Sequence, residues 1–159
     1  MPVLTPEAAS RWAAEQRAAG RAVVFTNGVF DLLHPGHTRY LAEARSHGDV
    51  LIVAVNSDQS VRALAKAADR PITPEAERAE LLSALAAVDA VVIFDEDTPL
   101  AIVTAIQPDV LVKGADWAAD AIVGRDVVEG RGGRVVRVAL APGYSTTAIL
   151  ERARASSRG

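Results

Sequence analysis

The chain has 159 residues, of which 50% are hydrophobic and 23% are charged, and its formal net charge is −3 at pH 7. This size and this mix predict one folded domain and exclude a wholly disordered chain. The slightly acidic balance creates no strong field for a nucleic acid or an anionic membrane, so we expect neither partner. The chain has no cysteine, which excludes disulfides, thiolate nucleophiles and Cys-ligated zinc.

The apolar segments are too short to cross a membrane, and the longest, such as residues 50–55, have the length of a buried strand. The first twenty residues are rich in alanine but are interrupted by prolines and charges, so they predict no signal peptide. We therefore expect a cytoplasmic protein.

The first predicted element is a helix, because residues 5–7 supply a capping hydroxyl, a proline and an acid, and Gly20 is a stop signal. The continuous apolar run at 50–55 is typical of a parallel strand that is covered by helices on both faces. The sequence predicts five strands, over 22–26, 50–55, 90–94, 110–112 and 135–139. The helix over 6–19 precedes the first strand, and a helix ending near 47 follows it. A short helix from 58 and a helix over 73–87 follow the second strand, and a helix from 98 to 107 follows the third. A short helix follows the fourth strand, and a last helix begins at 145.

Five strands that alternate with helices predict a single α/β domain over residues 1–159, a three-layer, doubly wound, Rossmann-like fold with a five-stranded parallel sheet. Its N-terminal helix lies within residues 1–20, and residues 155–159 have the composition of a flexible tail. Sheets of this kind bind ligands beyond the carboxyl ends of their strands, so we expect the functional residues in the loops that follow the strands.

Two of the three histidines, His34 and His37, follow the first predicted strand, with Pro35 and Gly36 between them. This spacing at a helix start lets both imidazoles point at one ligand, while free backbone N–H groups and the helix dipole favour an anion. Gly28 and Gly36 would let the backbone approach a nucleotide phosphate closely. The residues alone leave two other interpretations open, solvent-facing loop histidines or zinc ligands, although no further ligands complete a tetrahedral zinc site.

Residues 26–37, from Thr26 to His37, resemble the HxGH signature of the cytidylyltransferase-like nucleotidyltransferases. The resemblance continues in the right order over most of the chain, at 53–58, at Arg78, at 113–117 and at 145–147. Within this family, the residues at 56–58, 97–99 and 108–114 are most similar to the heptose 1-phosphate adenylyltransferase branch.

The resemblance implies an enzyme that transfers AMP from ATP to a sugar 1-phosphate, here D-glycero-D-manno-heptose 1-phosphate. The products would be ADP-heptose and pyrophosphate, formed by direct in-line attack of the acceptor phosphate. Such chemistry depends on fixed donors and cations that hold two anions together more than on a strong base. Mg²⁺ is expected as the cofactor, carried on the ATP phosphates, with no metal-binding residues of its own. A homodimer is also expected from the resemblance.

The resemblance assigns the site residues by position. The catalytic residues would be His34, His37 and Lys113. The nucleotide would be bound by Thr26, Asn27, Gly28, Phe30, Gly36, Arg78, Gly114, Asp116, Ser145, Thr146 and Thr147. The acceptor would be bound by Asp31, Asn56, Asp58 and Lys66.

Read as individual residues, several of these have ordinary interpretations as well. Lys113 could be a solvated lysine at a strand end, and Ser145 could be a plain helix N-cap, a role compatible with phosphate binding. Four basic side chains on helices or in a loop could serve the triphosphate or could be surface charges. These are Arg62, Lys66, Arg70 and Arg78.

The base and the acceptor leave alternatives open. Similar cytidylyltransferases carry an arginine five residues before Ser-Thr-Thr and a methionine at the lysine position, where this chain has Leu140 and Lys113, so adenine is favoured. Tyr144 is unexpected in either branch. The alternatives are a cytidylyltransferase for glycerol 3-phosphate or another polyol phosphate, an adenylyltransferase for a cofactor precursor such as phosphopantetheine or FMN, and a nucleotide-binding sensor without turnover.

Overall fold

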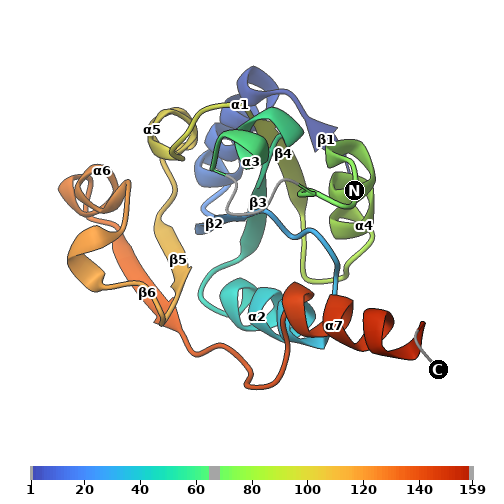
Figure 1. Ribbon diagram of the computed structural model, residues 1–159. Coiled ribbons are helices and arrows are strands. Elements are labelled where there is room, and N and C mark those ends of the chain that lie inside the picture. Colours follow the sequence, from blue (N-terminus) through green and yellow to red (C-terminus); the bar gives the residue numbers. More distant parts are fainter. Residues whose placement is uncertain (1, 65–68, 158–159) are drawn as a thin grey trace.

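A parallel sheet lies at the centre of the molecule, with the strand order β1-β4-β3-β2-β5-β6 (Figure 1). The computed structural model describes residues 2–64 and 69–157. The strands are β1 (Val3–Leu4), β2 (Val23–Gly28), β3 (Val50–Asn56), β4 (Ala90–Phe94), β5 (Val110–Gly114) and β6 (Arg134–Val138). The helices are α1 (Pro6–Ala18), α2 (Pro35–Arg45), α3 (Asp58–Leu64), α4 (Glu75–Ser83), α5 (Leu100–Ile106), α6 (Arg125–Gly130) and α7 (Thr146–Ser156), with a short 3₁₀ turn η1 (Ala119–Ala121).

The predicted α/β class and parallel sheet are confirmed, but the sheet over the described residues has six strands rather than five. The additional strand, β1, pairs Val3 with Val91 and Leu4 with Val92 at the edge of the sheet. Two residues are too few to produce an alternating pattern, so only the pairing with β4 defines this strand. At the other end of the chain, α7 continues to Ser156, into the stretch expected to be a flexible tail.

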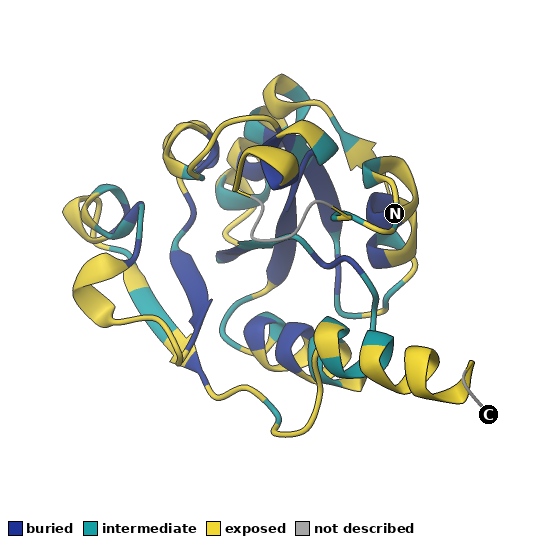
Figure 2. Cartoon of the chain, in the orientation of Figure 1, coloured by how far each residue is buried: buried dark blue, intermediate teal, exposed yellow. Residues whose placement is uncertain are grey.

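The hydrophobic core consists of two layers, one on each face of the sheet. Successive strand residues alternate between them, so Phe25 packs with α1, α5 and α6, whereas Val24 packs with α2 and α4. All seven residues of β3 are buried, as the apolar run predicts for a central parallel strand (Figure 2). Each fully buried Val, Leu or Ile side chain contributes roughly 1.5–3 kcal/mol, so this double layer holds the strand ends in fixed positions. No helix within the described residues has the length and apolar character needed to span a membrane.

The order of the strands places a crevice between β2 and β5. From β2 the chain continues to β3 and β4 on one side, and then returns to place β5 and β6 on the other side. In doubly wound sheets, ligands bind where the order reverses in this way, beyond the carboxyl ends of the two diverging strands. Asn27 and Gly28 end β2 at this point, and Lys113 and Gly114 end β5.

Candidate active site

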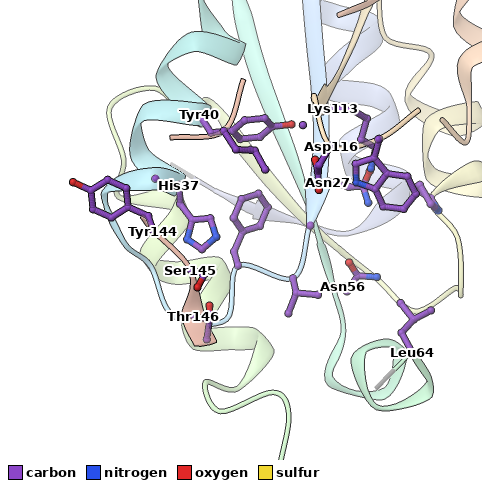
Figure 3. Close-up of a pocket in the computed structure, with 18 of the residues that line it drawn as sticks. Asn27, His37, Tyr40, Asn56, Leu64, Lys113, Asp116, Tyr144, Ser145 and Thr146 are labelled. Carbon is purple, nitrogen blue, oxygen red and sulfur yellow. The ribbon is translucent and has the colours of Figure 1, made fainter. Parts of the chain in front are cut away.

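A cavity of about 610 Å³ lies at the carboxyl ends of the central strands (Figure 3). Its volume lies within the range of about 300–1,000 Å³ that is usual for small-molecule sites. The ends of β2, β3 and β5 and the N-termini of α2 and α7 all contribute side chains to it. The residues expected from the sequence that line it are Asn27, Gly28, Phe30, His34, Gly36, His37, Asn56, Lys113, Gly114, Asp116, Ser145 and Thr146.

The two histidines lie together at the start of α2, where His34 is the N-cap and Pro35 occupies the first helical position. Their rings are stacked, with 3.8 Å between centroids and 18° between planes. His34 Nδ1 accepts a long hydrogen bond of 3.4 Å from the His37 backbone N–H. A Cβ atom at Gly36 would lie 2.9 Å from the His34 ring, so only glycine leaves room for this arrangement.

Both histidines are held toward the neutral form in the free protein. Burial, followed by the nearby charge of His34, lowers the pKa of His37 to about 4. Burial also lowers the pKa of His34. The His37 Nδ1 atom is buried and has no hydrogen-bond partner within residues 2–64 and 69–157. An incoming phosphate would favour the charged imidazolium and raise both pKa values, so the pair can respond to a bound anion.

Lys113 lies at the end of β5 with only 8% of its surface exposed. Its ammonium donates a 2.5 Å hydrogen bond to Asn27 Oδ1, and the Trp117 ring lies 5.6 Å from Nζ. Desolvation lowers the pKa of Lys113 to about 8, although the nearby Asp116 carboxylate acts in the opposite direction. The amine is therefore mostly protonated at pH 7, which makes it a fixed cation at the cavity wall.

The N-terminus of α7 supplies a second set of donors. Ser145 is the N-cap, and its Oγ accepts a 3.0 Å hydrogen bond from the Ala148 N–H. Thr146 follows at the cavity wall, whereas exposed Thr147 does not line it. Ser145 therefore has the capping role and a place in the cavity at once, as the sequence allowed, and helix N-termini of this kind favour phosphate groups.

Thr26 is fully buried and does not line the cavity, although the sequence suggested a nucleotide contact. Its hydroxyl shares a 2.8 Å hydrogen bond with the Tyr40 hydroxyl, which also donates to the Val112 carbonyl at 3.3 Å. Burial raises the pKa of Tyr40 to about 12. Thr26 thus ties β2 to α2 and, through Tyr40, to β5.

Arg78 is also fully buried and does not line the cavity. Its guanidinium donates to Asp58 Oδ1 at 2.7 Å, to the Val29 carbonyl at 2.6 Å and to the Thr73 carbonyl at 2.9 Å. A buried charge needs such compensating partners. Arg78 and Asp58 therefore join the loop after β2 to the segment before α4, and neither of them lines the cavity.

Asp31 is almost fully buried and holds the segment before α4. Its carboxylate accepts 2.9 Å hydrogen bonds from the Ile72 and Thr73 N–H groups. It also forms an ion pair with the Arg70 guanidinium, at 3.1 Å. It faces a second cavity of about 360 Å³, whose lining overlaps with that of the first and includes His37. The Asp31 carboxylate is thus already paired with three groups of the protein.

The remaining expected acceptor residues differ in placement. Asn56 lines the main cavity, with its Nδ2 donating to Ser60 Oγ at 3.0 Å. Lys66 lies outside the described residues.

Several lining residues had no assigned role in the sequence prediction. Trp117 and Asp97–Pro99 lie inside motifs that carried the family resemblance, and Tyr144 directly precedes Ser145, so a signal existed for these. No sequence signal pointed to Leu64 and Val123, because only the tertiary structure shows whether a single apolar residue at a helix end or in a loop lines a cavity. The full set without an assigned role is Val29, Tyr40, Leu64, Asp97, Thr98, Pro99, Trp117, Val123, Leu140, Ala141 and Tyr144.

A metal ion would find few protein ligands here. The described part of the chain contains no group of three or more His, Cys, Asp or Glu side chains that could hold one. Hard divalent cations such as Mg²⁺ prefer oxygen ligands and commonly take them from substrate phosphates. The residues present therefore fit a cation that is carried by a phosphorylated ligand.

The chain is similar to known proteins in sequence and in fold. Residues 25–152 match the family model described as cytidylyltransferase-like. The chain is 55% identical over 142 residues to the bifunctional protein HldE of Geotalea uraniireducens, covering 89% of this chain and 29% of that protein. It is 53% identical over 156 residues to the bifunctional protein HldE of Bradyrhizobium diazoefficiens, covering 98% of this chain and 31% of that protein. The chain thus spans less than a third of the length of these relatives.

A solved structure is similar as well. The lipopolysaccharide core biosynthesis protein from Thermoplasma volcanium is 33% identical, with a TM-score of 0.64, over 77% of this chain and 98% of that chain. The family model covers most of this chain, and the Thermoplasma protein is matched over nearly its whole length. The chain therefore belongs to the cytidylyltransferase-like family.

Proposed function

We propose that this chain transfers the adenylyl group of ATP to a sugar 1-phosphate, namely D-glycero-D-manno-heptose 1-phosphate, and releases pyrophosphate. The observation that carries the proposal is the convergence of the His34–His37 pair, Lys113 and the α7 N-terminus on one cavity. These groups are donors and cations, which are the groups needed to hold a triphosphate beside a second phosphate.

The reaction needs no covalent intermediate with the protein. An oxygen of the acceptor phosphate attacks the α-phosphorus of ATP, the new P–O bond forms, and the bond from the α-phosphorus to the bridging oxygen breaks so that pyrophosphate leaves. The acceptor phosphate is already ionised near pH 7, so no general base is required. Charge gathers on the α-phosphate oxygens, where Lys113 and the imidazole N–H groups can stabilise it.

The nucleotide and the acceptor are proposed from separate observations. Leu140 and Lys113 line the cavity where similar cytidylyltransferases carry arginine and methionine, which supports adenine as the base. The identity of 52–56% to bifunctional HldE proteins and the printed name of the Thermoplasma protein, which refers to lipopolysaccharide core biosynthesis, support a sugar acceptor.

Three expectations about the setting belong to the same proposal. Mg²⁺ would enter as part of the ATP substrate and balance charge on its phosphate oxygens. The use of ATP supports a cytoplasmic location, which cell fractionation would test. The family resemblance supports a homodimer, which sedimentation of the purified chain would test.

The experiment that tests the function measures pyrophosphate release in the presence of Mg²⁺. ATP and CTP are each paired with D-glycero-D-manno-heptose 1-phosphate and with glycerol 3-phosphate. We expect turnover only with ATP and the heptose phosphate. Turnover with CTP and glycerol 3-phosphate would replace the proposal with a cytidylyltransferase, and nucleotide binding without turnover on any acceptor would favour a sensor.

A further inference from the structure

Tyr144 stands beside the histidine pair in a position that the proposed chemistry does not explain. It belongs to the loop between β6 and α7, whereas His34 caps α2. The Tyr144 and His34 rings are nearly parallel, with 6.1 Å between centroids and 19° between planes. The guanidinium carbon of Arg39 lies 5.2 Å from the centroid of the Tyr144 ring.

The contact between this loop and α2 is tight at Gly36. A Cβ atom there would lie 2.9 Å from the His34 ring and also 2.9 Å from Tyr144 Cβ. The Cβ atom of Tyr144 therefore packs directly on the first turn of α2. This close approach is local, because Tyr144 itself is 39% exposed and is not part of the hydrophobic core.

Within residues 2–64 and 69–157, few other interactions define the orientation of the His34 ring. The hydrogen bond that its Nδ1 accepts from the His37 N–H is 3.4 Å long, longer than the usual range of about 2.7–3.2 Å, and is therefore weak. Its aromatic neighbours are His37, with 3.8 Å between ring centroids, and Tyr144, with 6.1 Å between ring centroids. Both neighbouring rings are nearly parallel to the His34 ring, at 18° and 19°, and aromatic pairs of this kind attract one another.

The tyrosine hydroxyl points away from the other labelled side chains in Figure 3, toward the outside of the cavity. The contact with His34 is therefore made by the ring and not by the hydroxyl. Tyr144 directly precedes Ser145, the N-cap of α7, so its backbone is continuous with the start of that helix.

We propose that Tyr144 is a positioning residue, whose ring sets the orientation of His34 and holds the α7 N-terminus against the start of α2. The inference rests on the proposed function, in which His34 and the α7 N-terminus act on the same triphosphate. Arg39 would assist by covering the exposed ring through a cation–π contact. The loop that carries Ser145 and the loop that carries His34 are thereby linked at one residue.

The first test observes His34 directly in the ligand-free protein and does not depend on activity. The chain has three histidines, so their Cε1–Hε1 signals in a ¹H–¹³C spectrum are few, and a His34→Asn variant identifies the signal of His34. We expect Tyr144→Ala to move the His34 signal, because the ring current is lost. Tyr144→Phe, which keeps the ring, should leave it in place, and His47 serves as an internal reference at the far end of α2.

The second test measures turnover. We expect Tyr144→Ala to lower kcat by about tenfold, equivalent to roughly 1.4 kcal/mol of activation free energy, with a smaller change in KM for ATP. Tyr144→Phe should restore kcat to near the wild-type value. Tyr144→Leu, which keeps an apolar side chain without a ring, should resemble alanine, and it replaces Tyr144→Ala if that variant does not fold.

The outcomes are separable. An unchanged His34 signal in Tyr144→Ala, wild-type kcat in Tyr144→Ala, or equal loss in the phenylalanine and alanine variants would each overturn the inference. A wild-type protein that is inactive with every acceptor would refute the proposed function instead. The His34 signal would then still show whether the Tyr144 ring lies against that imidazole.

Discussion

The Lys113 ammonium donates a hydrogen bond to Asn27 Oδ1 across the crevice between β5 and β2. The two residues are 86 positions apart in the chain and meet because their strands are neighbours that end at the same edge of the sheet. Asn27 thereby holds the only nearby amine at the cavity wall among the described residues, and it does so without neutralising the positive charge.

Replacing Lys113 with methionine should abolish most catalysis while leaving the fold intact. Loss of one fixed donor or cation at a developing charge costs on the order of 10²–10³ in kcat. Thermal unfolding should stay near the wild-type midpoint, because a largely buried amine is removed together with its desolvation cost. Asn27→Ala, which removes only the anchor, should lose less turnover in the same pyrophosphate assay. Equal turnover of Lys113→Met and wild type would refute a catalytic role for this amine.

The pH dependence of kcat/KM should report Lys113 in the free protein. Its pKa is lowered to about 8 by burial, so the cation that receives the phosphates is lost as the pH rises through 8. We expect kcat/KM for ATP to fall above pH 8. In Lys113→Arg, whose guanidinium stays charged, any remaining activity should not fall in that range. A decline at the same pH in both proteins would assign it to another group.

The stability of the protein should rise with pH between about 4 and 6.5 because of His37. Its pKa is about 4 in the folded protein and near 6.5 when unfolded, so within this window the unfolded chain binds more protons. Denaturant unfolding measured at several pH values should show a slope that flattens above pH 6.5. His37→Gln removes the titrating group, so an unchanged slope in that variant would show that other groups are responsible.

Replacing Arg78 with methionine should destabilise the protein. Its side chain pairs with Asp58 and two backbone carbonyls in a buried setting. Breaking a buried pair by removing one partner commonly costs about 3–5 kcal/mol. The change should be visible in urea unfolding. Asp58→Asn keeps the shape and should lose less stability with little effect on the KM for ATP. A large rise in KM with unchanged stability would instead place Arg78 in direct contact with the nucleotide.

Gly36→Ala should impair turnover by at least about tenfold, because the added Cβ would lie 2.9 Å from the His34 ring and displace it. Gly130→Ala is a matched control in α6, where a Cβ would have no neighbour within 4 Å. That control should keep full activity and stay close to the wild type in stability, because the added Cβ meets no neighbouring atom. Steady-state kinetics and thermal unfolding of the two variants check both statements.

The sequence predicts the placement of a residue when that placement depends only on a few neighbouring residues in the chain. His34 and His37 are brought together by one turn of helix, and Pro35 at the first position specifies where that turn begins. Ser145 is likewise an N-cap by its own local hydrogen bond. Such short-range features, together with the alternation of apolar strands and helices, are sufficient to predict the α/β class and the edge at which ligands bind.

The residues that behaved differently have partners distant in the chain. Asp31 was expected to bind the acceptor. In the structure its carboxylate accepts hydrogen bonds from the backbone N–H groups of Ile72 and Thr73, which are 41 and 42 positions away. Arg78 looked like a cation for phosphate, but Asp58 and the carbonyl after β2 surround it. The edge strand β1 exists only through its pairing with β4.

The sequence by itself thus determined the class of fold, the histidine pair at the start of α2 and the donors at the start of α7. These features depend on local backbone geometry and helix capping, which neighbouring residues in the chain determine. The tertiary structure alone decided which polar side chains remain open to a ligand. A buried charge or hydroxyl must find a partner, and packing determines whether that partner is the protein or a bound molecule.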